Sequence, residues 1–243
     1  MQPKTILAIP TDGLVNLYKP IGRSSAHYVY RLRRIFGVRK VGHAGTLDPF
    51  ADGVLLGCVG RATKLVERLM SLRKRYRTTL RLGVTNETFD PERPFEPVPH
   101  AVAPDERAIR EFLLTLIGTV AQVPPTFSAV RVGGVQSYER ARKGRPLELA
   151  ARPVRIDRLE LVSYAWPRCV IEIDCGRGTY IRAIARDLGT ALGCGAVCET
   201  LTRTAVGPFD SDTAVRLEAG DDAVRRSILT IDAVESAIAS ESQ

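Results

Sequence analysis

Hydrophobic positions along the chain repeat with two different periods, which predicts a mixture of strands and helices. Gly13–Lys19 alternates apolar and polar side chains and ends before Pro20, as a strand does. In the next segment, apolar residues recur four and three positions apart, which predicts a helix that Ser24 or Ser25 caps and Gly37 ends. These apolar residues are Tyr28, Leu32 and Ile35.

The same two periods divide the rest of the chain into further elements. Strands are predicted over 74–82, 154–164, 168–175 and 201–206, and helices over 62–72, 104–117, 136–143, 180–192 and 227–239. Segments rich in Gly, Asp and Pro predict loops over 42–53 and 83–100. Helices and strands follow one another without a regular βαβ rhythm, so we expect an α+β fold with a mainly antiparallel sheet.

Length and composition limit the class of protein. The 243 residues are 44% hydrophobic, which is enough for a packed core. No apolar run approaches the ~20 residues that span a bilayer, and the first residues carry no cleavage site for secretion. The five cysteines are an odd number in a chain of this size, so we expect reduced thiols in a cytoplasmic protein.

Positive charge is concentrated in the N-terminal third of the chain. The formal net charge is +8, and the pI is about 9.5. Seven basic and no acidic residues lie within 13–47, and eight basic residues with one acidic residue lie within 61–81, whereas 208–243 carries a net charge of −5. Clustered positive charge indicates a surface that binds nucleic acid phosphates, and a solvated basic face without a partner is the alternative.

Several kinds of cofactor or metal site lack support in the sequence. No GxxxxGK[ST] or GxGxxG element follows a predicted strand, so nucleotide cofactors are not indicated. Cys194 and Cys198 form a CxxxC pair without a second pair, which favours buried thiols over a zinc site. A catalytic set of Ser24 with His27 or His43 and an aspartate has no supporting spacing.

The glycine-rich stretch Val41–Gly60 holds the strongest candidate for catalysis. Asp48 lies between Leu47 and Pro49, so its neighbours are apolar and stiff, which is suited to holding one carboxylate rigidly at a wall. A simple Asx turn at Asp-Pro is the alternative.

Gly42–Pro49, with the sequence GHAGTLDP, resembles the GHxGxLDP signature of the TruB family of tRNA pseudouridine synthases. Six further motifs resemble the family in the same order along residues 17–207. They are LYKP with GRSS over 17–25, GRATK over 60–64, KRYR leading to LG over 74–83, VPP with SA and the later Tyr138, Ala141, Arg142 and Gly144, GTYIR with DLG over 178–189, and LTRTAVG over 201–207.

The resemblance implies the pseudouridine synthase fold, a bent, mixed, mainly antiparallel sheet with flanking helices and a central catalytic cleft. It implies isomerisation of uridine to pseudouridine in the TΨC loop of tRNA, at position 55, on a nucleotide flipped out of the loop. The reaction breaks the N-glycosidic bond, turns the uracil over and rejoins it through carbon. No redox change or group transfer occurs, so no cofactor and no metal is expected. tRNA is the implied partner, and a monomer without an obligatory protein partner is expected.

The resemblance also implies catalytic roles for three residues. Asp48 is the nucleophile, either at the anomeric carbon of the sugar or at the uracil ring, and the alternatives stay open here. Arg182 pairs with Asp48, keeps it ionised and fixes its orientation. Tyr76 stacks on the target base and helps to remove the proton from the new carbon–carbon junction.

Five residues are implied as substrate contacts in addition to Tyr76. His43 meets the RNA where the nucleotide leaves the stack, and Tyr180 hydrogen-bonds or packs on the displaced base. Leu201 forms an apolar wall, and Lys19 and Lys64 belong to the basic segments that grip phosphates.

The chain departs from the family pattern in its C-terminal part. We expect a catalytic domain over 1–207 and a short acidic tail with one helix over 208–243, too short for the PUA-type domain that bacterial family members generally carry. Tyr18 stands where the family more often has an acidic residue, and Arg177 replaces a lysine. A non-catalytic tRNA-binding and folding factor is the alternative function, and a hydrolase that uses Asp48 against a nucleoside bond is a more distant one.

Overall fold

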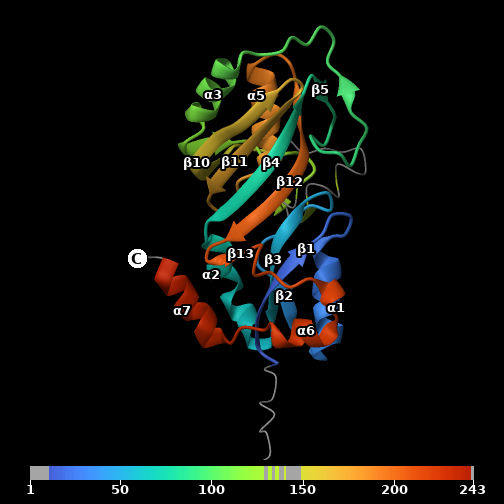
Figure 1. Cartoon of the computed structure of the whole chain (residues 1–243), viewed down its shortest axis with the longest axis vertical. Coiled ribbons are helices and arrows are strands. Elements are labelled where there is room, and N and C mark those ends of the chain that lie inside the picture. Colours follow the sequence, from blue (N-terminus) through green and yellow to red (C-terminus); the bar gives the residue numbers. More distant parts are fainter. Residues whose placement is uncertain (1–10, 129–130, 133–134, 137–139, 141–148, 242–243) are drawn as a thin grey trace, which may run out of the picture. The chain divides into compact units, whose positions relative to one another are not determined.

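The computed structural model describes residues 11–128, 131–132, 135–136, 140 and 149–241, and it divides the chain into two compact units (Figure 1). Unit 1 comprises Met1–Leu72 and Arg203–Gln243, and unit 2 comprises Arg73–Thr202. The return of the chain from unit 2 to unit 1 falls within the long strand β12 (Ala196–Val206).

Unit 1 is built around strand β3, which pairs antiparallel with both β1 and β2. The last residues of β12 pair with β13. The strands are β1 (Gly13–Lys19), β2 (Val41–His43), β3 (Asp52–Val59) and β13 (Phe209–Asp210). The helices are α1 (Ser25–Phe36), η1 (Gly60–Leu65), α2 (Val66–Ser71), η2 (Leu217–Ala219), α6 (Asp221–Arg226) and α7 (Ile231–Glu241).

The periodic pattern of α1 is confirmed, because its apolar residues Tyr28, Leu32 and Ile35 are buried and Gly37 ends the helix in the left-handed region at φ 64°. Gly57 on β3 explains how close the helix comes. A Cβ at that position would lie 2.3 Å from Cδ1 of Leu32. Helix α1 therefore packs against β3 at a position where glycine leaves room for the side chain of Leu32.

In its described residues, unit 2 is a mainly antiparallel sheet with strand order β12-β4-β11-β10-β7, accompanied by helices that include α3 and α5 (Figure 1). Its strands are β4 (Lys74–Leu82), β7 (Gly118–Gln122), β10 (Arg152–Ala165) and β11 (Arg168–Cys175), with the short pairs β5 (Val84–Thr85) with β6 (Glu96–Pro97), and β8 (Arg131–Val132) with β9 (Val135–Gln136). Its helices are α3 (Glu106–Thr115) and α5 (Ile181–Ala191). The α+β class predicted from the sequence is confirmed.

The C-terminal segment differs from the single helix predicted over 227–239. Helix α6 ends at Arg226 and α7 begins at Ile231, because Leu229 leaves the helical path to exchange two backbone hydrogen bonds with Leu14, at 2.8 and 2.9 Å. Thr230 then accepts a hydrogen bond from the backbone N–H of Ala233 and starts α7. The helix predicted over 136–143 lies largely outside the described residues, and Gln136 itself belongs to β9.

The segment after residue 207, predicted as a short acidic tail with one helix, packs into the core of unit 1. Val234 and Ile238 on α7 are buried in one cluster with Leu14 on β1, Leu56 on β3 and Val206 on β12. Those residues come from both ends of the chain, so α7 contributes to the stability of the unit that contains Asp48.

We predict that Ile238→Ala lowers the free energy of unfolding by about 2–5 kcal/mol, because it removes buried side-chain volume from this cluster. Leu114→Ala is the matched control, since Leu114 is a helical residue that is 63% exposed, and its change should stay within about 0.5 kcal/mol. Urea unfolding measures both. Equal, small effects would show that α7 does not belong to the core.

Candidate active site

Asp48 lies in the loop that joins β2 to β3, and three contacts fix the backbone of that loop. The Ser25 hydroxyl donates to the carbonyl of Leu47 at 3.0 Å and accepts from the N–H of Leu47 at 2.9 Å. The N–H of Gly22 donates to the carbonyl of Pro49 at 2.7 Å. Ser25 therefore holds the loop as the first residue of α1. Ser24 is the N-cap residue, as one of the two predicted alternatives, but its side chain makes no capping hydrogen bond. The Asp48 side chain stays half-buried.

Lys19 supports the same loop from below and does not lie on the surface. Its side chain is 0% exposed, and its ammonium donates to the carbonyls of Pro20, Pro49 and Ala51 at 3.0, 3.4 and 2.5 Å. The expectation that Lys19 grips an RNA phosphate is therefore wrong for this structure. A buried cation needs acceptors around it, and backbone carbonyls of the loop supply them.

His43 ends β2 and is half-buried at the start of the loop. Burial lowers the pKa of its imidazole, and the positive charge of Arg203 lowers it further, whereas a hydrogen bond with the backbone of Gly45 opposes both effects. His43 is therefore neutral at neutral pH. A neutral ring is the form that stacks on a base without adding charge.

In unit 2, Arg182 lies in the first turn of α5 and is 4% exposed. Its guanidinium donates to the carbonyl of Thr88 at 3.0 Å, to Oδ2 of Asp90 at 2.9 Å and to the carbonyl of Phe127 at 2.8 Å. Two segments that are remote in sequence thus fix the orientation of this side chain.

Asp90, which the sequence analysis did not single out, is a buried partner of the predicted site residue Arg182. Its Oδ1 accepts from the hydroxyl of Thr88 at 2.7 Å and from the N–H of Glu92 at 2.9 Å, while Oδ2 accepts from Arg182. Asn86 ties the loop together by donating to the carbonyl of Asp90 at 2.7 Å. The alternation of short polar residues at 86, 88 and 90 within a predicted loop is the signal that could have found it.

Tyr180 precedes α5, and its backbone is locked by one side chain. The N–H of Tyr180 donates to Oε1 of Gln122 at 2.8 Å, and Nε2 of Gln122 donates to the carbonyl of Tyr180 at 3.1 Å. This exchange holds the start of α5 on strand β7, so that Tyr180 and Arg182 have a common, rigid origin.

Tyr76 and Leu201 lie on the neighbouring strands β4 and β12. Tyr76 is half-buried, Leu201 is buried, and the hydroxyl of Thr78 donates to the carbonyl of Thr200 at 2.5 Å between the two strands. An aromatic face and an apolar wall are thus carried by adjacent strands of one sheet.

The predicted site residues fall into two groups. Unit 1 brings His43 and Asp48 together on one loop over Lys19, and it carries Lys64 exposed on η1. Unit 2 carries the other four, which are Tyr76, Tyr180, Arg182 and Leu201. The ion pair between Asp48 and Arg182 joins residues of different units and stays a prediction.

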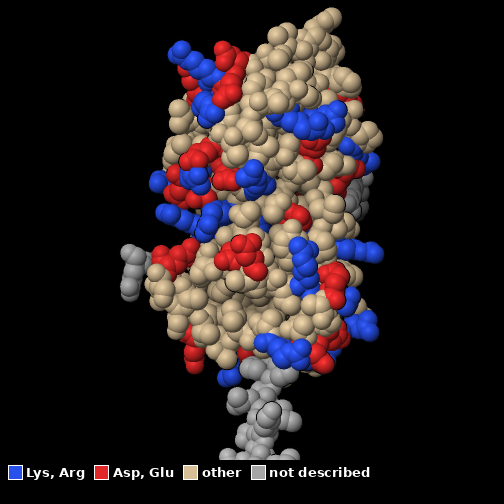
Figure 2. All heavy atoms as spheres, in the orientation of Figure 1, with Lys and Arg blue, Asp and Glu red and all other residues tan. Residues whose placement is uncertain are grey.

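The basic stretch 61–81 is offset by acidic residues from other parts of the chain. Five of its arginines form ion pairs with carboxylates at 2.5–3.6 Å. The pairs are Arg61–Asp12, Arg68–Glu235, Arg73–Asp157, Arg77–Glu172 and Arg81–Glu199. Figure 2 shows the consequence, because blue and red side chains interleave on the visible face. The stretch 61–81 therefore presents less net positive charge at the surface than its number of arginines predicts.

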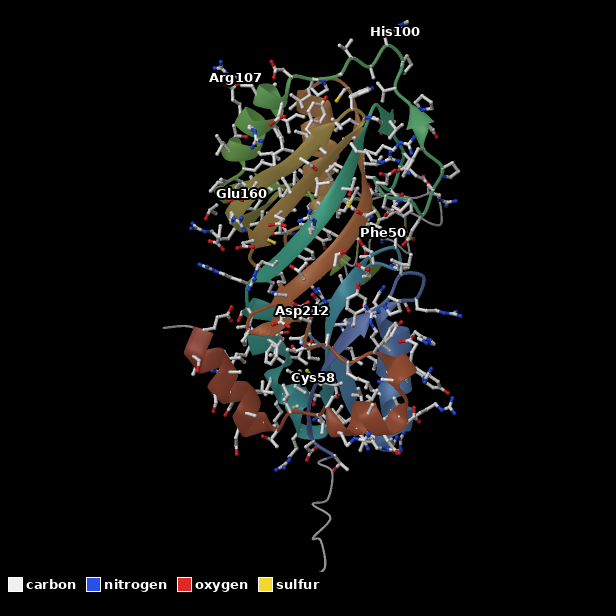
Figure 3. The ribbon with its side chains drawn as sticks, in the orientation of Figure 1. Phe50, Cys58, His100, Arg107, Glu160 and Asp212 are labelled. Carbon is white, nitrogen blue, oxygen red and sulfur yellow. The ribbon has the colours of Figure 1, made fainter. Side chains whose placement is uncertain are left out.

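The thiols and the remaining polar groups suggest no further chemistry. All five cysteines are buried and free, as the sequence predicted, and burial raises the pKa of Cys58, Cys169 and Cys175 to about 12. Cys58 lies inside unit 1 and Phe50 marks the Asp48 loop in Figure 3. Within the described ranges, no cluster of three or more His, Cys, Asp or Glu could hold a metal, and no helix is long and apolar enough to cross a membrane.

Comparisons with known proteins match most of the chain to one family. Residues 33–181 match the model of the TruB family pseudouridylate synthase N-terminal domain, and residues 182–237 match that of the tRNA pseudouridylate synthase B C-terminal domain. A tRNA pseudouridine synthase B of Syntrophobacter fumaroxidans is 46% identical over 85% of this chain and 68% of its own length. One of Bordetella pertussis is 43% identical over 86% of both chains.

A solved Cbf5–Nop10–Gar1 complex contains a chain of the same fold, with a TM-score of 0.71 and 25% identity. The match covers 93% of this chain, which spans 62% of the solved chain. The fold and the rigid aspartate loop thus define a pseudouridine synthase. The chain belongs to the TruB family of pseudouridylate synthases.

We predict that Asp90→Ala lowers the free energy of unfolding by about 3–5 kcal/mol, because it removes a buried carboxylate that is paired with the buried Arg182. Glu87→Ala is the matched control from the same loop. Glu87 pairs with Arg93 on the exposed surface, so its loss should cost about 0–1 kcal/mol. Thermal and urea unfolding compare the two variants, and equal effects would contradict the structural role of Asp90.

Proposed function

We propose that the protein isomerises uridine to pseudouridine in the TΨC loop of tRNA, at position 55, with Asp48 as nucleophile. The observation that carries the proposal is the loop of Asp48. Its backbone is fixed by Ser25, Gly22 and Lys19, and its carboxylate is left half-buried on a segment that matches the family signature. The names of the relatives, tRNA pseudouridine synthase B, support tRNA as substrate.

The chemistry needs one carboxylate and a way to hold it. Asp48 attacks the anomeric carbon or the uracil ring, the N-glycosidic bond breaks, and the base rejoins the sugar through carbon. All atoms of the substrate stay in the product, so the reaction needs no oxidant, reductant or group donor. Arg182, oriented by Asp90, pairs with Asp48 and keeps it ionised in this proposal.

The other residues receive the flipped nucleotide. Tyr76 stacks on the uracil and assists removal of the proton, Tyr180 packs on the displaced base, and Leu201 forms the apolar wall. His43, neutral because of burial and the nearby Arg203, lies against the RNA where the nucleotide leaves its stack. Lys64 is exposed on η1 and contacts a phosphate.

We further propose that the enzyme acts in the cytoplasm on the TΨC stem-loop, as a monomer without an obligatory protein partner. Its affinity for tRNA depends on salt through the basic residues that remain exposed and without a carboxylate, rather than through all fifteen that the two N-terminal stretches contain.

We predict that Lys64→Met reduces the slope of log affinity against log salt by about 0.7–0.9, the value for one phosphate contact. Lys19→Met is the matched comparison, because it removes the same charge from a buried position. It should lower stability and leave the slope of the folded protein unchanged. tRNA binding from low to high salt measures both slopes, and a reduced slope for folded Lys19→Met would place that lysine on the RNA.

We predict that Asp48→Asn abolishes pseudouridine formation while tRNA affinity stays within about threefold of wild type. The substitution keeps the size of the side chain and removes the nucleophile, which should cost several powers of ten in rate. Single-turnover conversion of a tRNA transcript, with pseudouridine mapped along it, measures rate and position together.

Two outcomes would contradict the proposal. Conversion by Asp48→Asn within about tenfold of wild type would remove Asp48 from the mechanism. A wild-type protein that binds tRNA without forming pseudouridine would favour the RNA-folding alternative.

A further inference from the structure

Arg203 on β12 has a buried guanidinium to which no role has been assigned so far. It is 1% exposed, and none of the ion pairs in the described part of the chain includes it. Its donors go to backbone carbonyls instead: Nε to Val54 at 2.8 Å, Nη2 to Gly45 at 3.1 Å and Nη1 to Thr46 at 3.4 Å. Burying a cation without a carboxylate costs free energy, so we look for the role of Arg203 in the backbone segments that it binds.

The three acceptors belong to two segments that the guanidinium joins. Val54 lies on β3, whereas Gly45 and Thr46 lie in the loop that leads to Asp48. Gly45 and Thr46 lie midway between two proposed site residues, since His43 lies two residues before Gly45 and Asp48 lies two residues after Thr46. One planar side chain thus fixes the midpoint between two proposed site residues.

One glycine shows that β3 passes close to the backbone of Arg203. A Cβ on Gly53, at φ 103°, would lie 2.2 Å from the carbonyl oxygen of Arg203, so β3 and β12 approach each other where only glycine fits. Gly45, whose carbonyl accepts from the guanidinium, has a φ of 97°, a conformation that favours glycine.

We propose that Arg203 is a positioning residue for the isomerisation: it fixes the Gly45–Thr46 backbone and thereby the His43 ring and the Asp48 carboxylate on either side of it. This inference rests on the proposed function. It extends that function to a side chain inside unit 1, which touches neither the base nor the sugar.

The charge of Arg203 has a second, separable effect on His43. Nδ1 of His43 is buried, and the positive charge of Arg203 adds to burial in lowering the pKa of the ring. Elements packed on β2 carry other polar groups, but Arg33 on α1 donates to the carbonyl of Val41, Cys58 on β3 stays neutral, and Lys64 on η1 is exposed.

The variants Arg203→Met and Arg203→Lys distinguish the effect of the guanidinium's hydrogen-bond geometry from the effect of its positive charge. The lysine keeps a positive charge but cannot span carbonyls on two segments. A folded Arg203→Lys protein is expected, because Lys19 shows that a fully buried ammonium satisfied by carbonyls is tolerated in this unit. Arg225→Met is the matched control, since Arg225 also donates to a backbone carbonyl, that of Ile35 at 2.8 Å, on another part of unit 1.

The test measures the single-turnover rate of pseudouridine formation, tRNA affinity and the titration of His43 by NMR, all at a temperature where each variant is folded. Arg203→Met should lose about 100-fold in rate, the cost of a reacting group misplaced by about 1 Å, with a smaller change in affinity. Arg203→Lys should lose about 10-fold. The pKa of His43 should rise in Arg203→Met, where a positive neighbour is gone, and stay low in Arg203→Lys.

A rate for folded Arg203→Met within about threefold of wild type would overturn the inference. So would losses in Arg203→Met that Arg225→Met reproduces. If Arg203→Met does not fold, Arg203→Lys decides alone, and a wild-type rate in that variant overturns the proposal.

A wild-type protein without synthase activity would refute the proposed function and would leave the clamp testable. Hydrogen exchange at the amides of 44–51 should then still be faster in Arg203→Lys than in wild type. Unchanged exchange in that variant would overturn the role of Arg203 as well.

Discussion

Burial of cations against backbone carbonyls is the constraint on which the Asp48 loop depends. Lys19 and Arg203 are the two largest charged side chains that unit 1 encloses, and each donates to carbonyls of the loop or of the strand that follows it. A carbonyl dipole offsets part of the desolvation cost of a cation only at hydrogen-bond distance. The loop therefore cannot change shape without exposing an unsatisfied charge, and this coupling makes it rigid.

Unit 2 applies the same principle with a carboxylate added. Arg182 and Asp90 are both almost fully buried, and every contact of Asp90 described above leads back to its own loop or to Arg182. Replacing such a pair by apolar residues is often neutral for stability, so its value lies in orientation. One carboxylate and two carbonyls fix the orientation of the Arg182 guanidinium. Pre-organised donors of this kind cost no reorganisation during a reaction.

The sequence predicted those parts of the structure in which local pattern and tertiary contact agree. Strands β4 and β11 match their predicted limits, because buried and more exposed side chains alternate along each. Strand β1 matches as well, although almost all its side chains are buried, because Pro20 follows it and marks its end. Strand β3 was missed because almost all its side chains are buried and no alternation remains. The break between α6 and α7 was missed because it depends on hydrogen bonds from Leu229 to Leu14, over 200 positions away. Asp48 is proposed from its motif, whereas the roles proposed for Asp90 and Arg203 rest on their burial, which the spacing of residues in the sequence does not report.

Charge illustrates the difference between a count and a surface. The stretches 13–47 and 61–81 looked alike as sequences, yet they fold differently. In the second, arginines on β4 and its neighbours meet carboxylates from strands that arrive later in the chain, so positive and negative side chains alternate over the sheet (Figure 2). In the first, α1 buries its apolar face against β3 and turns Arg33 and Arg34 outward, on a segment that contains no acidic residue. The exposed arginines of α1 therefore keep more of their positive charge than the arginines of the sheet, which are paired with carboxylates.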